Sequence, residues 1–240
     1  MRTFVINLDR DKERMNFALR QATKNGYEIQ RVPGVLGREL PAEELRRSVN
    51  RFRFRCSTGR DAFPGEIGCA LSHFNIYRKM IEENIPFACI LEDDIVILDG
   101  FTEKLAELEM WFDEKKAQVV RLNLPYDDNK VFPKGIFRSY DSTSACSYCL
   151  NLTAAKTLLS INYPLEAPCD HWPRWCQKNG KIELYDVNPK VCWHNNGYTG
   201  FSSVIVSEED KSPRSGSRFV SLWFKAIRYV TRHIQRIAKV

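Results

Sequence analysis

Short apolar runs alternate along the chain with stretches in which apolar residues recur at three- and four-residue spacing. A run of about four to eight apolar residues is typical of a buried strand, and the wider spacing is typical of an amphipathic helix. The runs predict strands over Thr3–Leu8, Glu28–Val32, Phe87–Leu91, Val119–Leu124, Ile136–Ser139, Ser147–Leu150 and Ile182–Tyr185. The wider spacing predicts helices over Arg10–Lys24, Pro41–Arg47, Pro64–Glu83, Phe101–Phe112, Thr153–Ser160 and Asp170–Lys178.

The order of these elements predicts an α/β fold. Strands and helices alternate in the first half, which favours a Rossmann-type sheet, and the irregular second half favours an α+β arrangement. We expect residues 1–206 to form one catalytic domain. Ser207–Ser217 is polar and contains Pro and Gly, so it is predicted to be a linker. Residues 218–240 place apolar residues at helical spacing among basic ones, which predicts a basic amphipathic tail helix.

Charge is concentrated in that tail. The 36 Lys and Arg residues and 30 Asp and Glu residues give a net charge of +6. Residues 211–240 hold eight basic and no acidic residues, which leaves 28 basic and 30 acidic residues, or −2, in residues 1–210. A nucleic-acid-binding body is therefore disfavoured, and the tail is predicted to bind an anionic membrane surface or to pack on protein.

Eight cysteines occur in the chain without an apolar run long enough to cross a membrane or a visible export signal. The expectation is a cytoplasmic protein with reduced thiols. Cys146 and Cys149 have zinc-type spacing, with Cys169, Cys176 and Cys192 downstream. Because a second tight pair is missing, packing of these cysteines in the core is favoured over a zinc site.

Two charged segments stand out. Arg46–Arg60 contains six arginines with Phe52 and Phe54 between them, and it is predicted to be a loop. That loop would be either a solvated connection or an electropositive lip for an anionic substrate. Glu92, Asp93 and Asp94 follow directly on the apolar run Phe87–Leu91. Three adjacent carboxylates at a strand end indicate either a Mg²⁺ or Mn²⁺ site or a solvated turn.

A more specific motif covers Pro64–Ile97, PGEIGCALSHFNIYRKMIEENIPFACILEDDIVI. It consists of a Gly-Glu-Ile-Gly-Cys…Ser-His helix and a strand that leads into Glu-Asp-Asp. This segment closely resembles glycosyltransferase family 25, which includes bacterial lipooligosaccharide sugar transferases and collagen galactosyltransferases. INLDRDKERM at residues 6–15 and PGVLGREL at Pro33–Leu40 are similar to further family segments. The resemblance spans about residues 3–205 and implies a GT-A-like, nucleotide-sugar-binding domain.

The resemblance also implies a donor site with a divalent ion, Mn²⁺ or Mg²⁺. By this resemblance Asp94 is the principal metal ligand and His194, in a late loop, is a candidate further ligand, with a solvent-exposed loop histidine as the alternative. The residues expected to contact the donor are Asn7, Arg14, Glu66, Ser72, His73, Glu92 and Asp93. For His73 the alternative is a structural histidine in the core, and for Arg14 it is an ordinary surface arginine.

An inverting transferase needs a carboxylate that takes the proton of the acceptor hydroxyl. Asp170, in a Pro-x-Asp-like segment, is the predicted catalytic base, with Glu166 and Asp186 as alternatives and a helix cap as its structural role. Trp172 and Trp175 would stack on sugar or pack in the core.

The resemblance implies transfer of a hexose, most often galactose, from a UDP-sugar to a lipid-linked saccharide of the lipooligosaccharide or LPS type. The protein is then expected at the inner face of the bacterial inner membrane as a peripheral protein, and a homodimer is left open. A non-catalytic module that binds saccharide or polyanion is the alternative. A phosphatase of the Asp-x-Asp type is disfavoured because the acids follow a later strand and begin with Glu.

Overall fold

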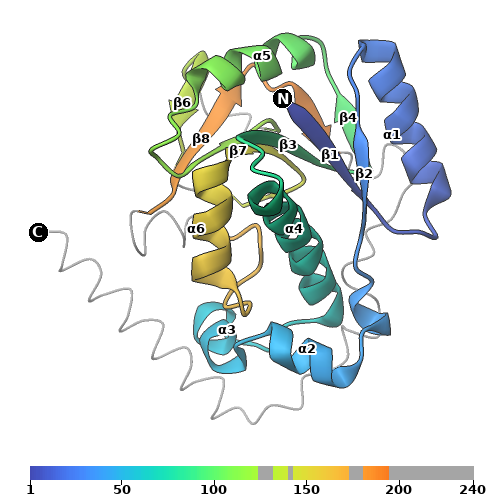
Figure 1. The fold of residues 1–240 in the computed structure, drawn as a ribbon, viewed down its shortest axis with the longest axis vertical. Helices are drawn as coiled ribbons and strands as arrows, with labels where there is room; N and C mark the ends of the chain where they lie inside the picture. The colour runs from blue at the N-terminus through green and yellow to red at the C-terminus, as the bar shows by residue number, and fades with distance from the viewer. Residues whose placement is uncertain (124–131, 140–142, 173–180, 195–240) are drawn as a thin grey trace, which may run out of the picture.

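The computed structural model describes residues 1–123, 132–139, 143–172 and 181–194, with only the backbone of His194 (Figure 1). The strands are β1 (Arg2–Asn7), β2 (Gln30–Pro33), β3 (Phe87–Glu92), β4 (Ile95–Ile97), β5 (Gln118–Arg121), β6 (Gly135–Arg138), β7 (Ser147–Asn151), β8 (Glu183–Asn188) and β9 (Cys192–His194). The helices are α1 (Lys12–Asn25), a 3₁₀ turn at Gly37–Glu39, α2 (Ala42–Ser48), α3 (Arg51–Thr58), α4 (Pro64–Glu82), α5 (Phe101–Trp111) and α6 (Leu152–Asn162).

Seven strands form one mixed sheet in the order β2-β1-β3-β7-β5-β8-β6. The first three strands in this order, β2, β1 and β3, are parallel to one another, and β5 is parallel to β8. The strand β7 runs antiparallel between β3 and β5, and β6 runs antiparallel at the far edge. The expected α/β fold, with a parallel first half and a mixed second half, is confirmed.

Helices cover both faces of this sheet. Successive strand residues point to opposite faces, so Ile90 joins the core beneath α4 and α6, whereas Leu91 joins the core beneath α1 and α5. In Figure 1 α4 and α6 lie side by side on one face, with α5 on the other. Both residues are at most 3% exposed, so the centre of the sheet is buried on both sides. The candidate site lies where β1 and β3 end, beyond this buried centre.

Two glycines bring residues 35–37 against the first turns of α4. A Cβ added to Gly37 would lie 1.7 Å from the Pro64 carbonyl oxygen, and one added to Gly68 would lie 2.3 Å from the Val35 carbonyl oxygen. One turn further along α4, the Ser72 hydroxyl accepts a hydrogen bond from the Val35 amide at 2.8 Å. The two family-like segments, Pro33–Leu40 and the start of α4, are thus packing partners.

The predicted loop over Arg46–Arg60 is wrong, because α2 continues to Ser48 and α3 occupies Arg51–Thr58. The side chain of Asn50 caps α3 by accepting a hydrogen bond from the Arg53 amide at 3.2 Å. Within α3 only Phe54 is buried, whereas Phe52 is 60% exposed. A short helix with one buried residue shows little apolar periodicity, which explains the error.

The ribbon formed by β4 and β9 was not predicted. The other predicted strands and helices in the described residues are confirmed within a few residues at each end. The predicted linker at 207–217, the tail helix at 218–240, Trp175, Cys176 and residues 173–178 of the predicted Asp170–Lys178 helix lie outside the described residues. Among the described helices, none is long and apolar enough to cross a membrane.

Candidate active site

Four polar side chains meet where β1 and β3 end: Asn7, Arg14, Asp93 and Asp94, which we call the carboxylate edge. The two strands are parallel neighbours with Ile6 opposite Glu92, so Asn7 and Asp93 leave the sheet together. The Asn7 Nδ2 donates a hydrogen bond to Asp93 Oδ2 at 2.6 Å. Ligand sites in open α/β sheets lie at the carboxyl ends of strands, as this group does.

Arg14 is held by both aspartates. Its guanidinium contacts Asp93 Oδ1 at 3.0 Å through Nη1 and donates to Asp94 Oδ2 at 2.6 Å through Nη2. The Arg14 side chain is 13% exposed, so it is not an ordinary surface arginine. The first turn of α1 brings Arg14 to this place because the helix begins directly after β1.

Arg31, on β2, orients Asn7. Its Nε donates to Asn7 Oδ1 at 3.0 Å, and its Nη2 donates to the Asn7 carbonyl oxygen at 3.2 Å. The Asn7 amide, which also donates to the Asp11 carbonyl oxygen, therefore has its donors and acceptor engaged within the protein. Asn7 then acts on the site through Asp93.

Three carboxylates, those of Glu92, Asp93 and Asp94, follow one another here, and Arg14 contacts the last two. Burial raises the pKa of Asp93 to about 6, against the opposing effects of Asn7 and Arg14. Burial also raises the pKa of Glu92 well above its usual value, and the nearby Cys69, Asp94 and Asp93 raise it further. Carboxylate oxygens are the ligands that Mg²⁺ and Mn²⁺ prefer. The chemistry of these residues therefore fits a hard divalent cation.

The β4–β9 ribbon brings the backbone of His194 next to the carboxylate edge. Ile95 follows Asp94 directly, and the two antiparallel strands set Ile95 opposite His194. His194, nearly a hundred residues away in sequence, is thus in a strand beside the acidic cluster and not in the loop expected for it. This register agrees with a shared role for Asp94 and His194, and the assignment of either as a metal ligand stays a prediction.

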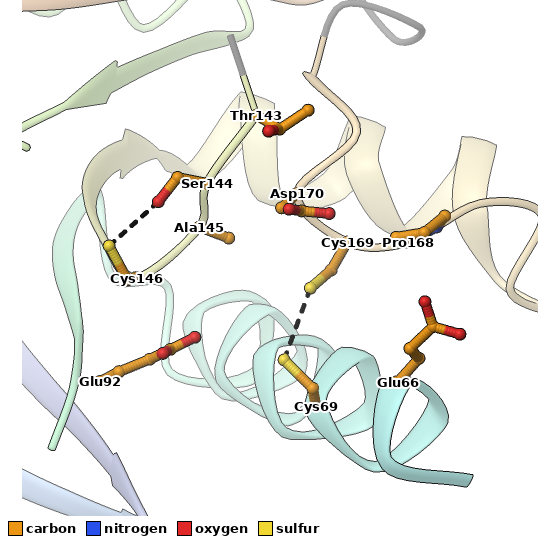
Figure 2. Close-up of a pocket in the computed structure, with 10 residues that line it drawn as sticks. All are labelled: Glu66, Cys69, Glu92, Thr143, Ser144, Ala145, Cys146, Pro168, Cys169 and Asp170. Carbon is orange, nitrogen blue, oxygen red and sulfur yellow. Dashed lines mark hydrogen bonds between the residues drawn. The ribbon is translucent and has the colours of Figure 1, made fainter. Parts of the chain in front are cut away.

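A pocket of about 280 Å³ lies next to the third carboxylate, Glu92. Figure 2 shows Glu92 and Glu66 at opposite ends of this pocket, with Cys69 and Cys169 between them. Asp170 also lines it, and burial is the main cause that raises the Asp170 pKa. Within the described residues, no hydrogen bond or ion pair engages the Glu92 carboxylate. Glu92 and Asp170 are therefore the pocket carboxylates placed to contact a ligand.

Glu66 and Ser72 have structural partners. The Glu66 carboxylate accepts a hydrogen bond from the Phe63 amide at 2.9 Å, which caps α4, and it receives both terminal nitrogens of Arg60. Ser72 donates to the Gly68 carbonyl oxygen at 2.8 Å and anchors Val35. Of these two predicted donor contacts, Glu66 reaches the pocket and Ser72 does not.

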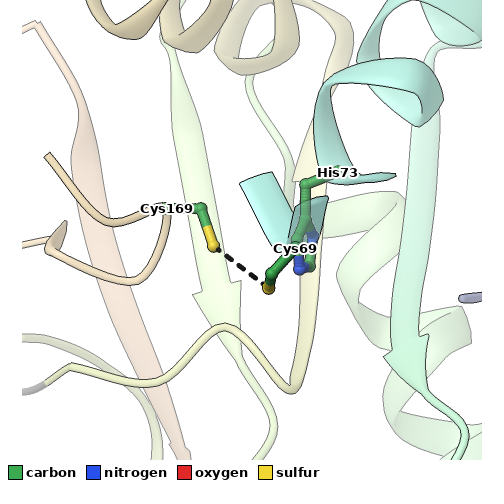
Figure 3. A group of neighbouring side chains, drawn as sticks. All are labelled: Cys69, His73 and Cys169. Atoms are coloured by element: carbon green, nitrogen blue, oxygen red, sulfur yellow. Dashed lines mark hydrogen bonds between the residues drawn. The ribbon is translucent and has the colours of Figure 1, made fainter. Parts of the chain in front are cut away.

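His73 lies in a second group, with Cys69 and Cys169, which we call the thiol cluster (Figure 3). The His73 ring is fully buried, and its Nδ1 shares a hydrogen bond of 2.8 Å with the Tyr148 hydroxyl. Cys69 Sγ and Cys169 Sγ are 3.7 Å apart and share a hydrogen bond. That bond and His73 lower the pKa of Cys69 to about 5, and the pKa of Cys169 is raised.

The alternative bases have other partners. Asp186 accepts from buried Arg121 through both carboxylate oxygens, at 2.8 and 2.7 Å, and Glu166 pairs with Arg53 at 3.1 Å. Neither lines the pocket that Asp170 lines. Trp172 is fully buried and donates to the Ser144 carbonyl oxygen at 2.8 Å, so it packs in the core and offers no face to a sugar.

Of the two alternatives for this segment, the electropositive lip is disfavoured, because five of the six arginines between 46 and 60 are paired with four acids. The pairs are Arg47–Glu43, Arg51–Asp61, Arg53–Glu166, Arg55–Asp61 and Arg60–Glu66. Cys146 and Cys149 are buried, as the core-packing interpretation expected, and Cys149 faces Cys89 across the sheet.

Sequence reasoning missed Cys69, Cys169 and Arg31 as site residues. A signal for the first was present, because Cys69 and His73 are four apart in a predicted helix and therefore share one face. No spacing rule points to Cys169, a hundred residues later, since only the packing of the segment before Trp172 on α4 brings it there. Arg31 reaches Asn7 only because β1 and β2 are parallel neighbours.

Comparison with known proteins identifies the family. A family model described as "Glycosyltransferase family 25 (LPS biosynthesis protein)" matches residues 1–172. A "Glycosyltransferase 25 family member" of Aedes aegypti is 28% identical over 235 residues, covering 87% of this chain and 38% of that protein. Procollagen galactosyltransferase 2 of Mus musculus is 32% identical over 120 residues, which cover 48% of this chain and 19% of that protein. The chain thus spans well under half the length of these relatives.

Among solved structures, a glycosyltransferase involved in the glycosylation of the major capsid of PBCV-1 is 10% identical. The match covers 77% of this chain and 80% of that chain with a TM-score of 0.34, which is too low to indicate a common fold. The family model, in contrast, covers most of the chain and includes the carboxylate edge and the thiol cluster. The chain belongs to glycosyltransferase family 25.

Proposed function

We propose that the chain transfers a hexose, galactose foremost, from a UDP-sugar to a saccharide acceptor with inversion at the anomeric carbon. The observation that carries this proposal is the convergence of Asn7, Arg14, Asp93 and Asp94 where β1 and β3 end, beside the pocket lined by Glu92 and Asp170. Family membership supports sugar transfer, and a procollagen galactosyltransferase among the relatives supports galactose.

The departing nucleoside diphosphate creates the main chemical problem, because negative charge builds up on its phosphates. Asp94 and His194 would hold Mn²⁺ or Mg²⁺, which stabilises that charge by several kcal/mol. Arg14 holds Asp93 and Asp94 together, and Asn7 also binds Asp93. Asp93 and Glu92 would contact the donor. Arg14 adds a positive charge at the place where the diphosphate would lie.

Asp170 is the proposed base. Its carboxylate would accept the proton of the acceptor hydroxyl as that oxygen attacks the anomeric carbon from the side opposite the diphosphate, which inverts the configuration. Its raised pKa, caused mainly by burial, brings it nearer to the pH at which it works and makes it a better proton acceptor than an exposed aspartate. His73, engaged with Tyr148 in the thiol cluster, has no direct role in this step.

We propose a lipid-linked saccharide of the lipooligosaccharide type as the acceptor. The basic residues of 218–240 support this choice, because each Lys or Arg near an anionic leaflet contributes about 1 kcal/mol to binding. The protein would then work as a peripheral protein on the inner face of a bacterial inner membrane. Deleting 218–240 should move the protein from sedimenting anionic vesicles to the supernatant, and an unchanged distribution would refute the membrane proposal.

Hydrolysis of the donor tests the catalytic proposal without an acceptor. Purified protein is incubated with UDP-galactose, UDP-glucose or UDP-N-acetylglucosamine, with Mn²⁺ or with a chelator, and released UDP is measured. We expect Mn²⁺-dependent release, fastest with UDP-galactose, and a loss of at least about 100-fold in Asp94→Ala.

Asp99→Ala is the matched control, because Asp99 is an exposed aspartate on the same segment of chain. Full activity in Asp94→Ala would show that the metal assignment is wrong. Binding of saccharide with no release of UDP from any donor would instead favour a non-catalytic binding module.

A further inference from the structure

The thiol cluster has the geometry of a site for a soft metal ion. A ring nitrogen of His73 and the sulfurs of Cys69 and Cys169 all lie within 4.8 Å of one another. The two sulfurs are 3.7 Å apart. Two thiolates bound to one tetrahedral Zn²⁺ at about 2.3 Å each are about 3.8 Å apart. The sulfurs therefore already have the separation that zinc requires.

The histidine is prepared for a ligand. Metal-bound histidines usually use their other ring nitrogen in a hydrogen bond that fixes the ring, and His73 Nδ1 has this bond, with the Tyr148 hydroxyl at 2.8 Å. The Tyr148 hydroxyl is itself 2.6 Å from the Tyr77 hydroxyl. The other nitrogen, His73 Nε2, is buried and has no hydrogen-bond partner within the described residues. A buried ring nitrogen without a partner is costly unless something binds it, and the tautomer with hydrogen on Nδ1 leaves the Nε2 lone pair available for a metal ion.

We propose that Cys69, His73 and Cys169 bind one Zn²⁺. Two thiolates and an imidazole form the three-ligand set that leaves a fourth, open position. The pocket supplies that position, because Cys69 and Cys169 both line it (Figure 2). Thiolate and imidazole ligands select zinc over Mn²⁺ and Mg²⁺, so this site is distinct in chemistry from the carboxylate edge.

Such an ion would join two parts of the fold. Cys69 and His73 lie on α4, whereas Cys169 lies in the segment after α6 that leads to Trp172. Asp170 follows Cys169 directly, so zinc would fix the segment that carries the proposed base. This last consequence rests on the proposed function, whereas zinc binding itself does not.

Cobalt reports on this site directly. The full-length protein is reduced, freed of metal with a chelator, and titrated with Co²⁺, then with Zn²⁺. We expect about one equivalent of Co²⁺ with the d–d absorption of a tetrahedral ion and a sulfur-to-cobalt charge-transfer band, both lost when Zn²⁺ displaces it. Cys69→Ser and Cys169→Ser should each lose the charge-transfer intensity and weaken Zn²⁺ binding by more than about 10-fold. Cys56→Ser, a half-buried cysteine on α3, is the matched control and should bind as the parent does.

A second measurement does not depend on whether the variants fold. In the unmutated protein, bound Zn²⁺ should protect Cys69 and Cys169 from alkylation, with Cys56 modified equally with and without metal, as read by peptide mass spectrometry. Absence of stoichiometric Co²⁺ binding, or binding that Cys69→Ser and Cys169→Ser leave unchanged, would overturn the proposal.

The two proposals fail separately. Loss of zinc binding with UDP-sugar hydrolysis intact would remove only the zinc site. Zinc binding in a protein that hydrolyses no UDP-sugar would remove only the transferase.

Discussion

The carboxylate edge and the thiol cluster lie in the same part of the fold, and they hold their charges in opposite ways. At the carboxylate edge, Asp93 and Asp94 are ionisable oxygens partly balanced by one guanidinium, that of Arg14. In the thiol cluster, the two sulfurs share a hydrogen bond and the imidazole is bonded to the Tyr148 hydroxyl. Among the described residues, no ion pair joins an arginine or lysine to this cluster. By our proposals, the first group would bind a hard cation through carboxylate oxygens, and the second would bind a soft one through sulfur and nitrogen lone pairs.

The two groups differ in the kind of metal ion that they would hold, and one pocket can combine both kinds. A hard ion exchanges easily and suits a diphosphate that must come and go, whereas a thiolate-bound ion is usually structural. Glu92 faces the pocket from the end of β3, and Cys69 faces it from α4. The experiments below alter one group at a time and ask whether the other responds.

The largest effect is expected for Asp170→Asn. Without the base, transfer to the acceptor should fall by about 100- to 10,000-fold, whereas Co²⁺ binding at the neighbouring Cys169 should remain. Steady-state rates measure sugar transfer, and cobalt spectra measure Co²⁺ binding. Glu166→Gln is the control, because Glu166 pairs with Arg53 outside the pocket. If Glu166→Gln causes the greater loss, Asp170 is not the base.

Gly68→Ala should destabilise the fold by about 3 kcal/mol, because the new methyl group would overlap the Val35 carbonyl oxygen. Gly68 precedes Cys69, so the thiol cluster should be disturbed more than the carboxylate edge. Urea denaturation gives the free energy of unfolding. Gly100→Ala is the control for a glycine with open space around it, and its positive φ should cost only about 1 kcal/mol. Equal losses in the two variants would contradict the close contact.

Arg14→Gln removes the counter-charge of the carboxylate edge. We expect the free energy of unfolding of the metal-free protein to fall by about 2 kcal/mol. Asp93 and Asp94 stay buried in the variant but lose the positive charge of Arg14. Added Mn²⁺ should raise the midpoint of thermal unfolding more in this variant than in the parent. Arg10→Gln, at an exposed arginine whose nearest acid is 3.8 Å away, should respond as the parent does. A smaller Mn²⁺ effect in Arg14→Gln would argue against a cation at this edge.

We expect the smallest effect for Tyr148→Phe, a fall of about 1 to 2 kcal/mol in the free energy of unfolding. Both the His73 ring and the Tyr77 hydroxyl lose a hydrogen-bond partner in this variant. Cobalt affinity of the thiol cluster should fall about 10-fold through the freed imidazole, and UDP-sugar hydrolysis should be unchanged. Tyr77→Phe removes the hydroxyl pair but leaves the bond to His73, so it should keep the parent's cobalt affinity. Identical cobalt affinities in the two variants would show that Tyr148 does not orient His73.

The apolar pattern was sufficient to predict most elements and the α/β class. Buried strands such as β3, with five consecutive apolar residues before the acidic triplet, have a strong local signal. The insertion of β7 between β3 and β5 has no such signal, because pairing between distant strands depends on the whole sheet. The short ribbon of β4 and β9 is too brief to show alternation.

The site was predictable where a motif fixes it and not where contacts are long-range. The acidic triplet and Asn7 belong to two strand ends that the sequence indicates, and the structure brings Asn7 and Asp93 together at 2.6 Å. Arg14 was equally compatible with a surface position until its ion pairs were known. The link between Cys69 and Cys169 needs the segment after α6 to fold back on α4, which no local pattern encodes.

The contact between Gly37 and Pro64 has a consequence for how this family can diversify. The backbones of Gly37 and Pro64 touch. The segment between them, which contains α2 and α3, therefore begins and ends at the same place beside the start of α4. Insertions or deletions within it can be absorbed without shifting the register of α4 or the sheet. This excursion also bonds to the chain near Leu165, through the amide of Asn50 and the carbonyl of Ser48. Changes in α2 and α3 would therefore act first on the chain near Leu165, which leads to Asp170, the proposed base.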